Sequence, residues 1–178
     1  MLKKLKVEPI STLTNLAYLG VAFSISEAAA PNLLLIASLV GLCASSAAFH
    51  YGGSEHNTPA HKADVFAVYL TLAALLCHVW DNNIYLIAAV FTALPAVGMH
   101  MKSLNLYRLG GGIAIGVAIS LLLKAGTPDA FLPIGLATAA GGVRFLLQPK
   151  IKESLTDFVH GAWHILTAAA MYTAWVIL

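Results

Sequence analysis

Two histidines at the start of the last apolar segment are the first residues whose spacing suggests chemistry. His160 and His164 stand four residues apart, so a helix would place both on one face, about 6 Å apart along its axis. Histidine inside an apolar membrane helix costs free energy unless it has a partner. The pair alone is compatible with two ligands of a metal ion, with an interfacial polar pair, or with half of a haem site.

Three further polar residues stand at the ends of neighbouring apolar segments. Ser46 and His50 are four residues apart at the end of segment 31–50, and Asp64 stands near the start of the next segment. Because consecutive membrane helices joined by a short loop return to the same side, these residues share one level of the bilayer. The two histidines of the last segment are predicted to begin their helix at that level.

Three histidines and a water molecule make up an open zinc site, in which the metal lowers the pKa of the water to about 7. His50, His160 and His164 are the candidate ligands. Asp64 would serve as a general base, or as an acceptor that holds the water or an imidazole in place. Ser46 would donate a hydrogen bond to the water or to a developing oxyanion.

The composition explains where such a site would lie. Of the 178 residues, 59% are hydrophobic and only 10% are charged, and the mean hydropathy is +0.81, which lies outside the range of soluble globular proteins. A net charge of +2 is too small to predict a nucleic-acid partner. The sequence therefore predicts an integral membrane protein, and it identifies no protein partner.

Apolar segments of spanning length follow one another along the whole chain, which predicts an all-α membrane protein with a single seven-transmembrane-helix domain over residues 1–178. Tight connections at Pro31, Asp81 and Pro128 predict that neighbouring helices are antiparallel. The expected segments are 10–29, 31–50, 63–80, 83–100, 104–124, 129–147 and 157–178.

Lysines and arginines are distributed unevenly between alternate loops, which predicts the orientation. Only Lys124 falls on the side opposite the amino terminus. The amino terminus and the polar cluster are therefore expected at the cytoplasmic side, and the carboxyl terminus outside. The residues on the amino-terminal side are Lys3, Lys4, Lys6, Lys62, Lys102, Arg108, Arg144, Lys150 and Lys152.

The remaining four histidines are expected to lie outside the cluster or at its edge. His56 and His61 fall in a polar loop, where solvated side chains are expected. His78 is 14 residues beyond Asp64, about 21 Å along a helix, and so belongs to the opposite interface. His100 is expected near the cytoplasmic end of its segment, as a spare ligand or a headgroup contact.

Ser46-x-x-x-His50, Asp64 and His160-x-x-x-His164, spread over seven predicted helices, resemble the signature of the CREST superfamily of membrane hydrolases. This superfamily includes the alkaline ceramidases, the progestin and adipoQ receptors and the haemolysin III-like proteins. The resemblance implies that the three histidines bind Zn²⁺ and that the serine and the aspartate hold or activate its water. It also implies a membrane lipid as the substrate.

Two stretches are most similar to the alkaline ceramidases. The last segment continues with Ala168 and Tyr172, and the first is entered through Glu8, Thr12 and Asn15. This similarity implies hydrolysis of a ceramide-like amide, with an ester or another acyl lipid as the alternative. The acidic segment of the ceramidase calcium site is lacking, and Glu8 alone is a poor ligand set for an ion that takes six to eight oxygens. Calcium control is therefore not expected.

Two other classes of function remain open from the sequence. A haem-binding electron carrier would use facing histidines, but it gives no role to Ser46 and Asp64. A non-catalytic receptor would keep zinc for structure and close the fourth ligand position. The expected location is the plasma membrane, which is the inner membrane in a bacterium, with the site toward the cytoplasm.

Overall fold

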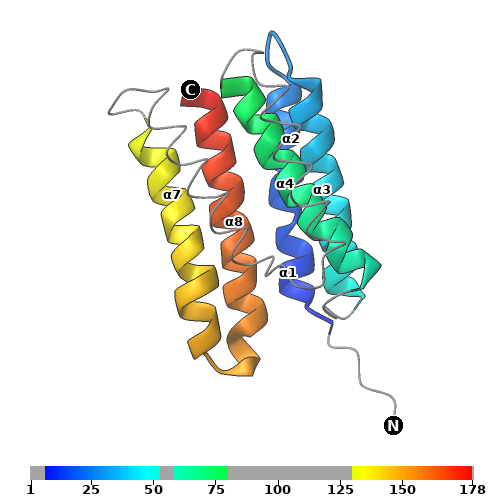
Figure 1. Cartoon of the computed structure of the whole chain (residues 1–178), viewed down its shortest axis with the longest axis vertical. Helices are drawn as coiled ribbons and strands as arrows, with labels where there is room; N and C mark the ends of the chain where they lie inside the picture. Colours follow the sequence, from blue (N-terminus) through cyan, green and yellow to red (C-terminus); the bar gives the residue numbers. More distant parts are fainter. Residues whose placement is uncertain (1–6, 53–57, 80–129, 178) are drawn as a thin grey trace, which may run out of the picture.

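The computed structural model describes residues 7–52, 58–79 and 130–177, and every regular element in these ranges is helical (Figure 1). The first predicted segment forms two helices, and the last predicted segment forms one long helix. The elements are α1 (Pro9–Thr14), α2 (Leu16–Ser26), α3 (Leu33–Tyr51), α4 (Pro59–Val79), α7 (Phe131–Gly141), a π-helical segment (Gly142–Leu147), a 3-10 turn (Gln148–Lys150) and α8 (Glu153–Ile177).

Five of the seven predicted segments fall within this part of the chain. The segments predicted at 83–100 and 104–124 lie outside the described residues, and so do His56 and His100. Several residues of the orientation argument also lie outside them, namely Lys3, Lys4, Lys6, Lys102, Arg108 and Lys124.

Three helices in the described ranges are long and apolar enough to cross a membrane. They are Leu33–Tyr51, Pro59–Val79 and Phe131–Lys150, the last of which includes the π-helical segment and the 3-10 turn. Large apolar side chains also point outward from the bundle, such as Phe23, Leu33 and Phe131. Outward apolar faces of this kind are typical of helices surrounded by lipid rather than by water.

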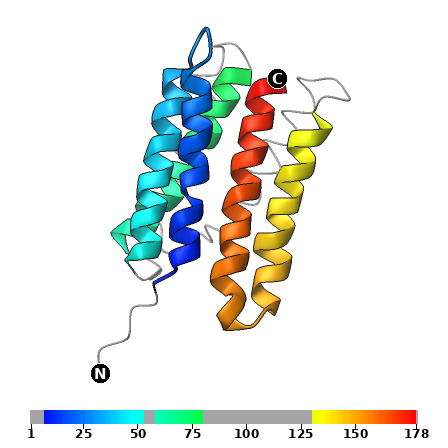
Figure 2. The same cartoon turned by 180° about the vertical axis from the view of Figure 1, so that it is seen from behind.

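The helices pack as two antiparallel pairs joined by the first segment. α3 and α4 run side by side in opposite directions, as do α7 and α8, which confirms the antiparallel arrangement predicted for these neighbours (Figure 1). α2 packs against α3 and α8, while α1 lies between α8 and the end of α3 (Figure 2). The first segment therefore connects the two pairs, and α1 is the part of it nearest to the histidines.

Apolar side chains of α2, α3, α4 and α8 form a common core. Tyr18 and Ile25 of α2 are buried against Leu39 and Leu42 of α3. Small side chains of α8, including Ala168 and Ala174, complete this core. Along α8 the core residues follow His164. This core therefore packs α8 against the other helices through side chains other than those of the histidines.

The prediction of one continuous helix over residues 10–29 was wrong at Asn15, where α1 ends and α2 begins. Asn15 is fully buried, and its side-chain Nδ2 donates to the Ser11 carbonyl at 2.9 Å. Asparagine side chains compete with the helix backbone for hydrogen bonds. The side chain therefore interrupts the helix at a position where the apolar pattern alone predicts continuity.

Candidate metal centre

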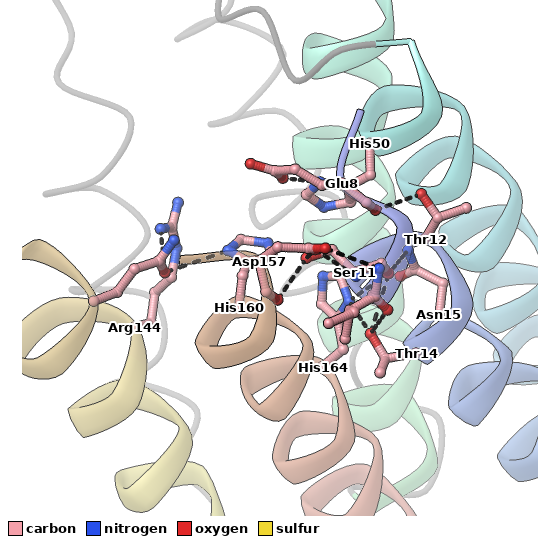
Figure 3. Close-up of polar contacts among 12 residues, drawn as sticks. Glu8, Ser11, Thr12, Thr14, Asn15, His50, Arg144, Asp157, His160 and His164 are labelled. Carbon is pink, nitrogen blue, oxygen red and sulfur yellow. Dashed lines mark hydrogen bonds and ion pairs between the residues drawn. The ribbon is translucent and has the colours of Figure 1, made fainter. Parts of the chain in front are cut away.

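The structure brings His50, His160 and His164 together, and all three side chains are buried (Figure 3). One ring nitrogen of each lies within 4.8 Å of the corresponding nitrogens of the other two. The ring centroids are 4.7 Å apart between His50 and His160, 5.2 Å between His50 and His164, and 4.8 Å between His160 and His164. These three imidazoles therefore form one compact cluster.

Two helices supply the cluster. His50 stands in the last turn of α3, and His160 and His164 lie one turn apart on the face of α8 that points toward it. Because α3 ends where α8 is beginning, their polar ends meet on one side of the bundle (Figure 1). The i, i+4 spacing on a regular helix is what sets two rings side by side.

His50 makes a short contact with an acidic residue that precedes α1. Its Nδ1 lies 2.7 Å from the Glu8 carboxylate, and the Glu8 backbone N–H donates to the His50 carbonyl at 3.2 Å. A carboxylate only accepts hydrogen bonds when ionised. The Nδ1 atom of the His50 ring therefore carries a proton and donates it to the Glu8 carboxylate.

His160 contacts a polar pair formed by Gln148 of the 3-10 turn and Arg144 of the π-helical segment. Its Nδ1 lies 3.3 Å from the Gln148 side-chain oxygen, which also accepts a hydrogen bond of 2.7 Å from the Arg144 guanidinium. Since a guanidinium only donates, the amide atom that faces both groups is the oxygen. His160 therefore also carries its proton on Nδ1.

His164 is held by the backbone and a side chain of α1. Its Nδ1 lies 3.1 Å from the Ser11 carbonyl and 3.1 Å from the Thr14 hydroxyl oxygen. The Thr14 hydroxyl donates to the carbonyl of Ile10 at 2.9 Å, so its oxygen is free to accept from the imidazole. His164 is therefore protonated on Nδ1 as well, and its Nε2 is buried without a hydrogen-bond partner in the described structure.

All three rings thus share one tautomer, with Nδ1–H bound to an oxygen and the Nε2 lone pair directed away from that oxygen. This is the arrangement of metal-binding histidines, whose second nitrogen is oriented by a carboxylate, a carbonyl or an amide. Tetrahedral Zn²⁺ with Zn–N bonds of about 2.1 Å needs nitrogens about 3.4 Å apart. The ligand nitrogens of the three residues lie within 4.8 Å of one another, so the donor set is compatible with zinc.

Ser46 and Asp64 lie beside the histidines. Ser46 is buried one turn before His50 on α3, and the Asp64 carboxyl on α4 stands next to the Ser46 hydroxyl. The Asp64 charge also lies within electrostatic range of the His50 ring and the Arg144 guanidinium. The structure therefore places all five predicted site residues at one end of the bundle.

Two other histidines are described, and one differs from expectation. α4 begins at Pro59, so His61 belongs to its first turn rather than to a solvated loop. Its side chain is buried, and its ring centroid lies 5.0 Å from that of Phe49. The prediction of a solvated His61 was wrong because an aromatic neighbour covers it. His78 stands in the last turn of α4, at the end remote from the cluster.

The residues that orient the rings are those that sequence reasoning missed. Glu8 belongs to the stretch that resembles the alkaline ceramidases and was tested as a calcium ligand, but the sequence predicts neither its contact with His50 nor any role for Gln148, Ser11 and Thr14. A weak signal was present, because Gln148 is a polar residue at the end of an apolar segment. Ser11 carried no such signal, since it contacts His164 through a backbone carbonyl that any residue type possesses.

Comparisons with protein-family models, with curated proteins and with solved structures find no match to this chain. The site is therefore interpreted from its own chemistry. It is a buried three-histidine cluster with an adjacent serine and aspartate, in an all-helical protein with helices of membrane-spanning length.

Proposed function

We propose that this protein is a zinc-dependent membrane hydrolase that cleaves an acyl lipid. The observation that carries the proposal is the buried cluster of His50, His160 and His164, in which one ring nitrogen of each lies within 4.8 Å of the other two. Neutral imidazoles suit Zn²⁺. A fourth position is left for a small ligand, which distinguishes a catalytic zinc site from a closed structural one.

When bound, zinc would lower the pKa of a water molecule and so supply a nucleophile at neutral pH. The Asp64 carboxylate would take the proton of that nucleophile as a general base and return it to the leaving group. The Ser46 hydroxyl lies beside Asp64 and would orient this carboxylate or donate to the developing oxyanion. The buried histidine environment excludes bulk water from the reacting groups.

A lipid is the substrate class that fits the surroundings. The site adjoins helices of membrane-spanning length, and an open apolar groove between α2 and α8 begins at Ile165, next to His164. Gly20 and Ala168 also line the groove, so an acyl chain lying in the bilayer would find an apolar surface on α2 and α8, the helix that carries His160 and His164. The resemblance to alkaline ceramidases makes a ceramide-like amide the first candidate and an acyl ester the second.

The proposed topology has seven spans in the plasma membrane, with the amino terminus and the site on the cytoplasmic side. A reporter that is active only outside the cytoplasm should therefore be active when fused after Leu178, and inactive when inserted in the loop predicted from Tyr51 to Lys62. The opposite pattern would overturn this orientation while leaving the metal site untouched.

The central experiment combines metal analysis with a lipid panel on the purified protein. We expect about one zinc per chain, and turnover of at least one lipid among ceramides, acyl amides and acyl esters. Asp64→Asn at saturating zinc should retain the metal and lose about 100- to 10,000-fold in turnover. Ser46→Ala should lose less, because water can replace a hydroxyl.

Two results would contradict this proposal and favour a different function. Stoichiometric zinc without turnover of any lipid in the panel would favour a receptor that keeps zinc for structure. A haem absorption spectrum with no zinc would favour an electron carrier.

A further inference from the structure

Asp157, one turn before His160 on α8, is bound to the start of α1. Its carboxylate accepts hydrogen bonds from the backbone N–H of Ile10 at 2.9 Å, from the backbone N–H of Ser11 at 2.7 Å and from the Ser11 hydroxyl at 2.6 Å (Figure 3). The first N–H groups of a helix have no partner within it, and a carboxylate there is favoured by the helix dipole. Asp157 thus caps α1 from another helix.

The same serine that binds Asp157 also orients a candidate ligand. The Ser11 N–H and hydroxyl contact Asp157, whereas its carbonyl accepts the Nδ1–H of His164 at 3.1 Å and the Asn15 side-chain N–H at 2.9 Å. In a continuous helix this carbonyl would accept the Asn15 backbone N–H. Here the backbone N–H of Asn15 donates instead to the Leu13 carbonyl, at the position where α1 ends and α2 begins.

A close contact fixes the distance between the two helices. A Cβ atom at Gly161 would lie 2.9 Å from the Ile10 Cγ2 and 3.2 Å from the Thr14 side chain. α1 therefore already touches the α8 backbone between the two histidines and cannot approach further. The Asp157 hydrogen bonds prevent it from moving away.

We propose that Asp157 is a positioning residue of the metal centre, acting through α1 to hold the Ser11 carbonyl against His164. This inference rests on the zinc site proposed above, but it concerns the affinity and geometry of that site rather than the reaction. Without the Asp157 cap, the start of α1 loses its attachment to α8. The His164 ring then loses the acceptors that fix its orientation.

Asp157→Asn tests the proposal, because an amide retains the size but turns a donor toward one of the α1 N–H groups. We expect the zinc dissociation constant, measured by chelator competition on the full chain in detergent, to rise about 10- to 100-fold, as for other losses of orienting partners. The visible spectrum of the Co²⁺-substituted protein should change as well, because it reports the coordination geometry.

Asn32→Ala is the matched control. Asn32 caps α3 at the opposite end of the bundle by accepting from the Leu35 N–H at 3.0 Å. Its loss should lower the melting temperature while leaving the zinc dissociation constant and the Co²⁺ spectrum unchanged. If Asp157 only stabilised the fold, Asp157→Asn would likewise lower the melting temperature and leave the zinc dissociation constant and the Co²⁺ spectrum unchanged.

A wild-type zinc dissociation constant and Co²⁺ spectrum in Asp157→Asn would overturn the proposal. If that variant does not fold, Ser11→Ala replaces it, since it removes the hydroxyl contact but keeps the Ser11 carbonyl. We expect weaker zinc binding and an altered Co²⁺ spectrum in Ser11→Ala, and unchanged values would overturn the proposal equally. Absence of zinc binding in the wild type is a different result, because it refutes the proposed function itself.

Discussion

The two halves of α8 are built differently although they belong to one continuous helix. The first half carries Asp157, His160 and His164, each of which makes hydrogen bonds to atoms of another element. The second half buries Met171 and Ala174 among apolar neighbours. Between helices surrounded by lipid, close van der Waals packing contributes most to association, and a single interhelical hydrogen bond adds little. The second half therefore packs the helix into the bundle. Hydrogen bonds of the first half fix the orientation of its polar side chains.

The strongest test of this division compares one substitution in each half. His164→Ala should abolish zinc binding, because the ion loses one of three protein ligands. Met171→Ala should cost about 2–5 kcal/mol of stability through the cavity it leaves, with zinc retained in the folded protein. Zinc content by mass spectrometry and thermal unfolding in detergent measure the two effects. Full zinc occupancy in His164→Ala would show that the polar half does not hold the metal.

A smaller effect is expected from the carboxylate that contacts His50. Glu8→Gln keeps an oxygen that can accept the Nδ1–H but removes the negative charge. We expect zinc affinity to fall about 10- to 100-fold with little change in stability. Glu27→Gln is the control, since Glu27 is exposed at the opposite end of the first segment. Equal zinc affinities in the two variants would mean that the Glu8 carboxylate does not tune the site.

The smallest expected effect concerns the close approach of α1 to α8. Gly161→Ala places a methyl group against Ile10 and Thr14, and overpacking of this kind costs about 1–3 kcal/mol. Gly20→Ala meets nothing within 4 Å and should be neutral or slightly stabilising, because alanine favours a helix over glycine. Thermal unfolding compares them. A Gly161→Ala protein as stable as Gly20→Ala would show that α1 has room to move.

Features that depend on helical spacing within one segment could be predicted from the sequence. Contacts between segments far apart in the chain could not. Ser46 with His50, and His160 with His164, follow from helical spacing, and the structure places each pair as that spacing predicts. The contacts of Glu8 and Ser11 could not be predicted, because they depend on how the first helix lies against the others. The interruption at Asn15 was missed because apolar residues on both sides favour a continuous helix.

The contacts of the three-histidine cluster span very different distances along the chain. His160 is 12 residues from Gln148 and Glu8 is 42 residues from His50, but His164 is 153 residues from Ser11. Closing a longer loop costs more entropy, although only about 0.6 kcal/mol for each doubling of its length. During synthesis α1 also emerges long before α8, so its contacts with α8 form only when the last helix has been made. The three-histidine cluster is therefore completed only after translation of the last helix, and the zinc proposed above would be bound late in biogenesis.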